Sequence, residues 1–270
     1  MWKLFSPSEY FWEEKAIRDF EICRGEPSGS SRILRDEAKA PPLHNDIITK
    51  RIRVLVKGLA NMIKNIIFDL GGVLMTDVPL VKIARDLSVR FSRSEDKIHS
   101  YLYPNEHWTR LTLGKISENE YWDHFLKASK VKVDREELKD RVRSELRPIE
   151  KNVEILPLLK SQYKLTVLSN HSREWSEFMR EEFDFFNYFD QIIISCDVEL
   201  RKPDPRIYQL TVKRLESKPE ECLFIDDKKR NTEGAESCGI NSIVFEDRIK
   251  LLENLPSFGV KIKGRESLVD

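Results

Sequence analysis

The chain has 270 residues and a formal net charge of zero, because 46 Lys and Arg residues balance 46 Asp and Glu residues. Without an overall field of one sign, general binding to nucleic acid or to an anionic membrane surface is not expected. No apolar run approaches the roughly 20 residues that cross a bilayer. The N-terminal stretch is rich in acidic residues and lacks the pattern of a targeting peptide, so we expect a cytoplasmic protein. The four cysteines stand at irregular spacings without a CxxC motif, which indicates neither a zinc knuckle nor a disulfide framework.

Residues 1–61 differ in character from the rest of the chain. Turn-forming and linker-forming residues cluster at Gly25–Ser31 and at Pro41-Pro42. A short amphipathic helix is expected over 10–22, and a short strand or helix over 52–59. None of this carries a motif with a chemical role. We therefore expect an N-terminal extension that is either poorly ordered or serves as a docking arm.

Regular structure is predicted after this extension. An apolar run at 65–68 predicts a buried strand, and Asp69–Leu74 (DLGGVL) follows it at once. Further along, Ser92, Ser117 and Asp134 each have a Glu three residues later, which is the pattern of a capped helix start. Helices without any strand are predicted in this stretch, over residues 79–91, 94–103, 105–113, 117–129 and 134–146.

After Pro148, short apolar strands alternate with helices. The predicted strands cover residues 165–168, 191–194, 222–225 and 242–245, and the predicted helices cover 152–162, 172–182, 205–215 and 232–238. This alternation predicts an α/β fold with a doubly wound, Rossmann-like parallel sheet that is covered on both faces. We expect the sheet domain to combine residues 62–76 with 148–258, and the helical stretch 77–147 to be inserted between these two segments.

Polar side chains follow several of the predicted strands at the point where each strand ends. In a parallel sheet these carboxyl ends meet at one edge, where ligands bind. The residues concerned are Asp69, Ser169, Asn170, Lys202, Asp226 and Asp227.

This set of side chains suits phosphoryl chemistry. A carboxylate can attack phosphorus and carry it as an aspartyl phosphate. Two carboxylates with other oxygen donors can hold Mg²⁺, and the adjacent Asp226 and Asp227 repel each other unless a cation compensates them. A hydroxyl, an amide and an ammonium group can neutralise the oxygens of a phosphoryl group. Gly71-Gly72 allow backbone N–H groups to approach a phosphate closely.

Four motifs in chain order resemble the haloacid dehalogenase superfamily. They are Ile66–Leu74 (IIFDLGGVL), Leu165–Asn170 (LTVLSN), Arg201–Tyr208 (RKPDPRIY) and Phe224–Asn231 (FIDDKKRN). The resemblance covers about residues 63–255. It is strongest to phosphatases of that superfamily with a helical cap, such as the glucose-1-phosphatase-like members.

The resemblance implies a metal site at the predicted edge of the sheet. Asp69 would be both the nucleophile and a ligand of Mg²⁺. The backbone carbonyl of Gly71 and the carboxylate of Asp227 would complete the protein ligands, with Asp226 and Asn231 in support. The expected cofactor is therefore Mg²⁺.

The resemblance also implies a phosphate site and a cap. Ser169, Asn170 and Lys202 would bind the transferring phosphoryl group, and Lys202 would also neutralise the nucleophile. The helical stretch 77–147 would be a cap domain that excludes water and selects the substrate. One part of it, Glu106–Ser117, resembles cap segments that shape the pocket, although we interpret its His and Trp as part of the cap core.

One position departs from the phosphatase pattern. Phosphatases of this superfamily usually carry a second Asp two residues after the nucleophile as general acid and base, and here that position is Gly71. Losing such a group typically costs about 10²–10⁴ in rate. An anomeric sugar phosphate has a less basic leaving group and needs the acid less. His171, Asp77 or a water could then activate the hydrolytic water.

Three hypotheses follow from this departure. The favoured one is a Mg²⁺-dependent phosphatase of small phosphate monoesters, such as a hexose 1-phosphate, acting as a monomer or homodimer on a small phosphorylated metabolite. A 2-haloacid dehalogenase is the second, although such enzymes need no Mg²⁺ and usually have an aromatic residue in place of Gly71. The third is a weakly active or non-catalytic ligand-binding member, against which the intact Asp69 and Lys202 argue.

Overall fold

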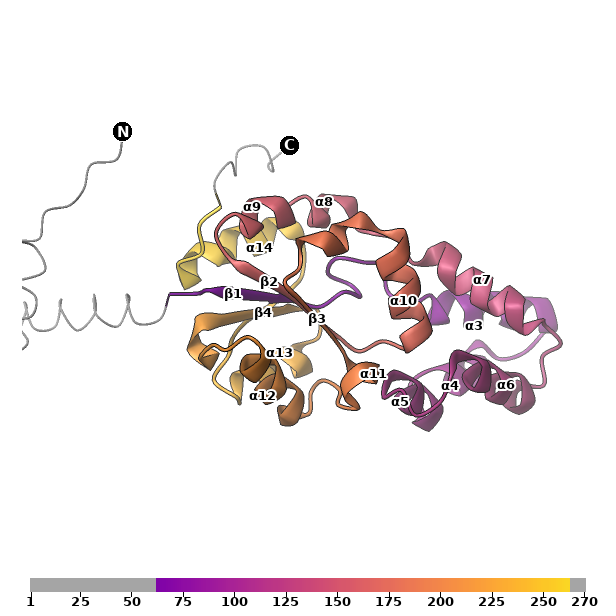
Figure 1. The fold of residues 1–270 in the computed structure, drawn as a ribbon. Coiled ribbons are helices and arrows are strands. Elements are labelled where there is room, and N and C mark those ends of the chain that lie inside the picture. The colour runs from indigo at the N-terminus through magenta and orange to yellow at the C-terminus, as the bar shows by residue number, and fades with distance from the viewer. Residues whose placement is uncertain (1–61, 263–270) are drawn as a thin grey trace, which may run out of the picture. The chain divides into compact units, whose positions relative to one another are not determined.

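The computed structural model describes residues 62–262, so the expectations for residues 1–61 lie outside the described part of the chain. Parallel strands form one sheet in the order β3-β2-β1-β4-β5 (Figure 1). The strands are β1 (Asn65–Phe68), β2 (Lys164–Ser169), β3 (Gln191–Ile194), β4 (Cys222–Asp226) and β5 (Asn241–Val244). The predicted doubly wound α/β fold is confirmed.

The strand order places a topological switch point between β1 and β4. The chain runs outward from β1 through β2 to β3, then returns to the other side of β1 with β4 and continues to β5. Phe68 is in register with Ile225, so the polar residues that follow these two positions, Asp69 and Asp226, come out side by side. A crevice outside such a switch point is where open α/β sheets bind ligands.

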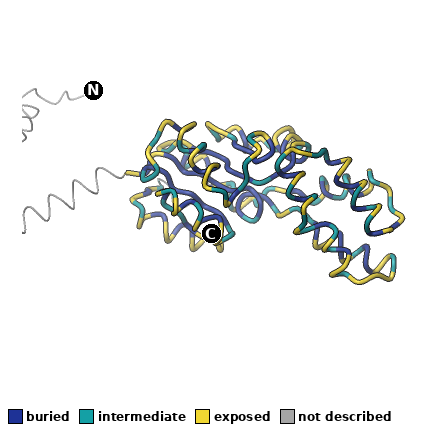
Figure 2. Tube along the Cα trace, turned by 90° about the horizontal axis from the view of Figure 1, so that it is seen from below, coloured by how far each residue is buried: buried dark blue, intermediate teal, exposed yellow. Residues whose placement is uncertain are grey.

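Alternate side chains of each strand enter two separate hydrophobic cores. Ile66 and Phe68 belong to one core and Ile67 to the other. Helices cover both faces of the sheet, and the strands between them are largely buried (Figures 1 and 2). On one face lie α8 (Glu150–Val153), α9 (Leu156–Lys160), α10 (Arg173–Glu182) and α14 (Arg248–Asn254), and on the other α12 (Pro205–Arg214) and α13 (Lys229–Glu236). This two-sided burial explains the continuous apolar character of the strands.

A helical cap is inserted between β1 and β2. Its buried side chains, including Trp122 and Phe125, continue one of the two sheet cores. Ser117 and Glu120 form the predicted capping box at the start of α6. The helices of the cap are α3 (Leu80–Phe91), α4 (Glu95–Leu102), α5 (Glu106–Thr112), α6 (Glu118–Ser129) and α7 (Arg135–Glu145).

Several predicted boundaries were wrong for identifiable reasons. The single helix predicted over 152–162 is the pair α8 and α9, because Pro157 lacks the N–H that a continuous helix needs there. Ser94 caps α4 in place of Ser92, which ends α3 in the left-handed conformation. Helix α13 begins at Lys229, earlier than predicted.

Some short elements escaped prediction altogether. Helix α14 follows the N-cap Asp247, whose carboxylate accepts from the Lys250 N–H at 2.8 Å. The one-turn helix α11 (Ser195–Val198) directly follows β3. Within residues 62–262, no helix combines the length and the apolar character that crossing a membrane would require.

Candidate active site

The Asp69 carboxylate lies at the carboxyl end of β1 and is bound on one oxygen only. Its Oδ1 accepts from the Leu70 N–H at 2.7 Å and from the Ser169 hydroxyl at 2.7 Å, and it lies 2.9 Å from Lys202 Nζ. The Asp69 N–H donates to the Ile225 carbonyl at 2.9 Å, which fixes the backbone to the neighbouring strand β4. Oδ2 has no hydrogen-bond donor among residues 62–262, so its lone pairs are available for a new bond.

Lys202 and Asp226 form a buried ion pair beneath this carboxylate. The distance from Lys202 Nζ to Asp226 Oδ2 is 2.6 Å, and Nζ also lies over the Phe224 ring. Asp226 further accepts from Asn231 Nδ2 at 2.9 and 3.0 Å and from the Lys228 N–H at 2.8 Å. Burial raises the pKa of Asp226 and Lys202 opposes that rise. The Asp226 carboxylate is thus engaged by protein donors on both oxygens.

The Asn170 side chain holds the loop that carries Lys202. Its Nδ2 donates to the Lys202 carbonyl at 3.0 Å, and its Oδ1 accepts from the Lys202 N–H at 2.9 Å. The side-chain amide is therefore committed to the backbone of Lys202. Any contribution of Asn170 to phosphate binding falls to its backbone N–H.

An acidic cluster lies beside Asp69. Asp69, Asp226 and Asp227 each offer a carboxylate oxygen, and these atoms lie within 4.8 Å of one another. Lys228 Nζ lies 3.4 Å from Asp227 and 3.8 Å from Asp77. Burial opposes the charge of Lys228, but the surrounding carboxylates outweigh it and raise the pKa of Lys228. The field here favours a cation, and hard oxygen donors are the ligands that Mg²⁺ prefers.

Two glycines allow neighbouring carboxylates to come close. Gly72 has a φ of +74°, and a Cβ at this position would lie 2.8 Å from Asp227 Oδ2. A Cβ at Gly71 would lie 2.8 Å from Asp77 Oδ1. Asp77 therefore reaches into the space that a side chain at position 71 would enter.

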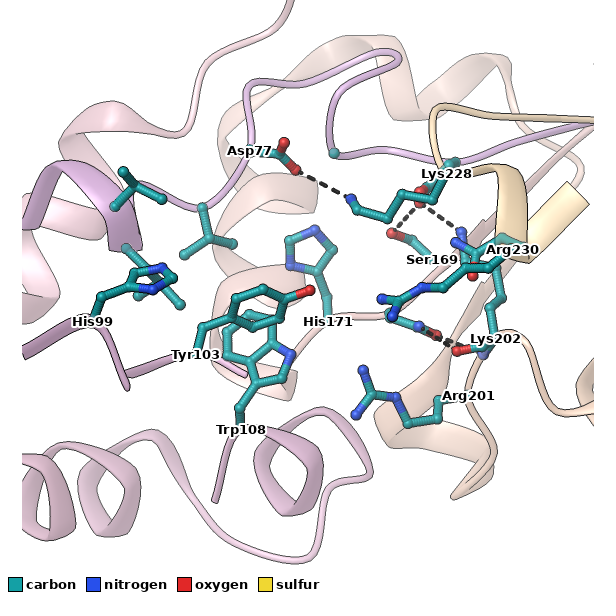
Figure 3. A pocket seen from close by; sticks show the side chains of 17 residues that line it. Asp77, His99, Tyr103, Trp108, Ser169, His171, Arg201, Lys202, Lys228 and Arg230 are labelled. Atoms are coloured by element: carbon teal, nitrogen blue, oxygen red, sulfur yellow. Dashed lines mark hydrogen bonds and ion pairs between the residues drawn. The ribbon is translucent and has the colours of Figure 1, made fainter. Parts of the chain in front are cut away.

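His171 lies between Asp77 and Tyr103 (Figure 3). It is buried, and its Nδ1 has no hydrogen-bond partner among residues 62–262. Burial, reinforced by the charge of Lys202, lowers the pKa of His171 to about 4. The imidazole is therefore neutral at pH 7.

These groups open onto a cavity of about 190 Å³ between the sheet edge and the cap. Cap residues give it a largely apolar wall, in which Trp108 packs edge-on against Tyr103 with ring centroids 5.3 Å apart. Trp108 is also buried against Trp175, so it is both cap core and pocket wall. His107 instead stacks on His124 within the cap and does not line the cavity.

Comparison of the sequence with protein families identifies a family whose match includes all of these site residues. The profile of the haloacid dehalogenase-like hydrolases matches residues 66–245. The chain belongs to this family.

Relatives of this haloacid dehalogenase-like hydrolase include phosphatases. A phosphorylated carbohydrates phosphatase of Thermotoga maritima is 32% identical over 189 residues, which are 66% of this chain and 82% of that protein. A sesquiterpene phosphatase of Aspergillus oryzae is 27% identical over 190 residues, covering 69% of this chain and 91% of that protein. A family enzyme of Bacteroides thetaiotaomicron, solved with magnesium and inorganic phosphate, superposes with a TM-score of 0.59 at 22% identity, covering 70% of this chain and 98% of that one. This last likeness concerns the fold.

Three further charged residues of this family member line the cavity without having been predicted. They are Arg201, Lys228 and Arg230. All three belong to the quoted motifs and stand next to predicted residues: Arg201 precedes Lys202, Lys228 follows Asp227, and Arg230 precedes Asn231. Their position next to predicted site residues could have indicated a role in the site. Whether each side chain points into the cavity, however, depends on the tertiary structure.

The cap of this hydrolase is held against the sheet domain by specific contacts. The Ser195 hydroxyl donates to the Thr112 carbonyl at 2.5 Å. Glu118 of the cap is buried and accepts from Trp175 Nε1 of the sheet domain at 2.7 Å. These contacts fix the apolar wall of the cavity over the Asp69 edge.

Proposed function

We propose that this hydrolase cleaves small phosphate monoesters with Mg²⁺ and through an aspartyl phosphate on Asp69. The carrying observation is the Asp69 carboxylate itself, which is fixed on Oδ1 by Ser169 and Lys202, whereas Oδ2 has no donor within the described residues 62–262. That arrangement presents one oxygen of a fixed carboxylate at the floor of a cavity. It suits a nucleophile that must receive a phosphoryl group.

In the first step, Asp69 Oδ2 attacks phosphorus and the bond from phosphorus to the ester oxygen breaks. The Ser169 hydroxyl and the Lys202 ammonium lie within 2.9 Å of the same carboxylate and can offset charge on the phosphoryl oxygens. The backbone N–H of Asn170 is the group of that residue left for the same task. The departing alkoxide takes up a proton from water in the cavity and leaves as the alcohol.

The residues present fit Mg²⁺. Asp69, Asp227 and the Gly71 carbonyl would hold the ion. When bound, its positive charge would offset the negative charge of the phosphoryl oxygens. Asp226 is engaged by Lys202 and Asn231, so we assign it to positioning these two side chains.

The second step needs a base for the hydrolytic water, which attacks phosphorus and releases Asp69. We propose Asp77, because its carboxylate fills the space beside Gly71 where a general acid and base would otherwise project. His171 is the weaker candidate, since a pKa of about 4 makes it a poor proton acceptor at pH 7.

A sugar phosphate, such as a hexose 1-phosphate, is the substrate class expected from the sequence. The name of the Thermotoga maritima relative, a phosphorylated carbohydrates phosphatase, supports it. A cytoplasmic location and a monomeric or homodimeric state stay predictions of the sequence.

The test is phosphate release from a panel of phosphorylated metabolites by the full chain, with Mg²⁺ and with EDTA. We expect release with Mg²⁺, none with EDTA, and none from Asp69→Asn. Asp140→Asn, at an exposed position on α7, is the matched control and should behave as wild type. Release by a clean Asp69→Asn preparation would exclude the mechanism.

If no phosphate ester is cleaved, a 2-haloacid assay on the same preparation separates the two remaining hypotheses. Halide release dependent on Asp69 would identify a dehalogenase. Ligand and Mg²⁺ binding without turnover of either substrate class would identify a non-catalytic member.

A further inference from the structure

Two arginines line the cavity beside its aromatic wall. Arg201 comes from the loop before α12 and Arg230 from α13. Figure 3 shows both guanidinium groups pointing toward the side of the cavity where Tyr103 and Trp108 lie. These four residues also line a second hollow that adjoins the cavity.

No carboxylate among residues 62–262 neutralises either arginine. Within residues 62–262, the hydrogen bond from Arg201 Nη1 to Thr109 Oγ1, at 2.9 Å, is made to a neutral group, and neither guanidinium lies in ion-pair contact with a carboxylate. Asp204 also lines this second hollow, but Arg206 binds both of its oxygens at 2.6–3.2 Å. The nearest candidate carboxylate is therefore already used.

The other cations of the cavity are matched by acids. Lys202 contacts Asp69 and Asp226, and Lys228 lies near Asp77 and Asp227. The arginine pair is thus an excess of positive charge beyond the groups that serve the transferring phosphoryl group.

The two guanidinium groups also repel each other. Arg201 is half-buried, and burial lowers the pKa of its guanidinium, which the charge of Arg230 lowers further. A bound anion would relieve this repulsion and make charge-assisted hydrogen bonds with both groups. Guanidinium groups bind carboxylates and phosphates in the same bidentate manner.

We propose that Arg201 and Arg230 bind a second anionic group of the substrate, a carboxylate or a second phosphate. The ester phosphate lies at Asp69, and the body of the substrate lies along Tyr103 and Trp108. The substrate class is then a phosphate monoester that carries another anion, and a neutral sugar phosphate is a poorer substrate. This inference rests on the proposed function for the placement of the ester phosphate.

Binding of non-hydrolysable probes tests the inference without turnover. Calorimetry on the full chain with Mg²⁺ would compare ω-phosphonoalkanoic acids with alkylphosphonates of equal chain length. We expect at least one chain length at which the carboxylate tightens binding by about tenfold. Arg201→Gln and Arg230→Gln should each reduce this gain, and Arg201→Lys should retain part of it.

Arg214→Gln is the matched control, because Arg214 is exposed at the end of α12 and lines neither the cavity nor the adjoining hollow. It should keep the full gain. Equal affinities at every chain length, or a gain that survives in the Arg201→Gln/Arg230→Gln double variant, would overturn the inference.

Kinetics then identify the second anion. Glucose 1-phosphate, glucuronic acid 1-phosphate and glucose 1,6-bisphosphate differ at one end of the sugar, and their relative kcat/KM values separate a carboxylate from a second phosphate. A preference for either charged ester that is lost in the double variant supports the inference. Equal kcat/KM values for all three esters contradict it. A carboxylate-dependent gain in phosphonate binding without any turnover would leave the second anion site standing and reject the proposed phosphatase activity.

Discussion

Asp77 reaches the active site from a chain position eight residues beyond Asp69, at the start of the cap insertion. Its Oδ1 lies 2.8 Å from the point where a Cβ at Gly71 would stand. A carboxylate at either position would therefore face the same part of the cavity. There is room for only one of these two carboxylates. The absence of a side chain at Gly71 is therefore what allows Asp77 to occupy this space.

This shared space predicts a rescue experiment. Asp77→Ala should lower kcat by about 10²–10⁴, because the hydrolytic water loses its base. Gly71→Asp placed in the Asp77→Ala background should recover part of kcat, since the new carboxylate enters the vacated space. Steady-state kinetics on one phosphate ester measure both effects.

Mg²⁺ affinity is the control for that experiment, because Asp77 also lies 3.8 Å from Lys228. If kcat of Asp77→Ala stays low at saturating Mg²⁺, the loss is due to the missing base and not to weaker Mg²⁺ binding. An unaltered kcat in Asp77→Ala would contradict the assignment of Asp77 as the base. His171 or a water molecule would then be the remaining candidate.

We predict that tight Mg²⁺ binding requires glycine at position 72. Gly72→Ala would place a Cβ 2.8 Å from Asp227 Oδ2 and displace this carboxylate. We expect Mg²⁺ affinity, measured by calorimetry, to fall by about 10–100-fold. Gly239→Ala is the matched control, because its φ of +81° imposes similar backbone strain while its Cβ would meet Pro219 at an ordinary 3.4 Å. Equal Mg²⁺ affinities in the two variants would refute the steric argument.

At the residue scale, the sequence predicted those site residues whose position follows from a strand end. The convergence of Asp69, Ser169 and Asp226 depends on strand register alone. The engagement of the Asn170 side chain by Lys202 and the exposure of Arg230 to the cavity depend on loop conformation, which no short pattern encodes.

The contact between the cap and the sheet domain depends on a close approach at Gly114. This glycine follows α5 with a φ of +68°, and a Cβ there would lie 2.5 Å from the Cys196 carbonyl oxygen. The contact joins α11 to the cap next to the hydrogen bond between Ser195 and Thr112. Any side chain at this position would push α11 away from the end of α5.

Gly114→Ala should therefore reduce both stability and catalysis. Gly259→Ala is the matched control, because Gly259 has a φ of +73° with nothing within 4 Å of its Cβ position. We expect Gly114→Ala to lower the free energy of unfolding by about 1–3 kcal/mol more than Gly259→Ala. Urea unfolding and kcat/KM measure the two effects, and equal losses in both variants would show that backbone strain alone is responsible.

Among the elements, the strands were the most predictable, because the central ones are short, largely apolar runs buried on both faces. In the cap, α6 and α7 begin at the predicted capping residues Ser117 and Asp134. The division of 152–162 into α8 and α9 follows from Pro157, which lacks the N–H that a continuous helix would need. Helix α14 has only seven residues, too few to show a clear helical period in the sequence.

For the molecule as a whole, the switch point between β1 and β4 brings the two acidic motifs together. The amino ends of the same strands are joined by Glu221, which accepts from Lys64 Nζ at 2.7 Å and from the Ser217 hydroxyl at 2.8 Å. Lys64, Ser217 and the Lys218 N–H together lower the pKa of Glu221 to about 2. Glu221 thus holds the amino ends of β1 and β4 together, while the carboxyl ends of the same two strands carry the acidic residues of the site.

This lowered pKa predicts a pH dependence of stability. A carboxylate with a depressed pKa stabilises the folded chain above its ordinary value of 4.5, and this contribution is lost as the pH falls from 4.5 toward 2. The difference in free energy of unfolding between wild type and Glu221→Gln should therefore narrow over that interval. Urea unfolding across the pH range measures it, with Glu220→Gln as the neighbouring control. A difference that stays constant with pH would contradict the prediction.

The most direct test of the central claim is to locate the phosphoryl group during a single turnover. The full chain with Mg²⁺ would be mixed with a cleavable phosphate ester, quenched in acid at successive times and digested for mass spectrometry. We predict that the peptide containing Asp69 gains one phosphoryl group, which then decays as inorganic phosphate appears. A phosphoryl group on a different peptide, or complete turnover with no phosphorylated peptide at any time, would contradict a mechanism through Asp69.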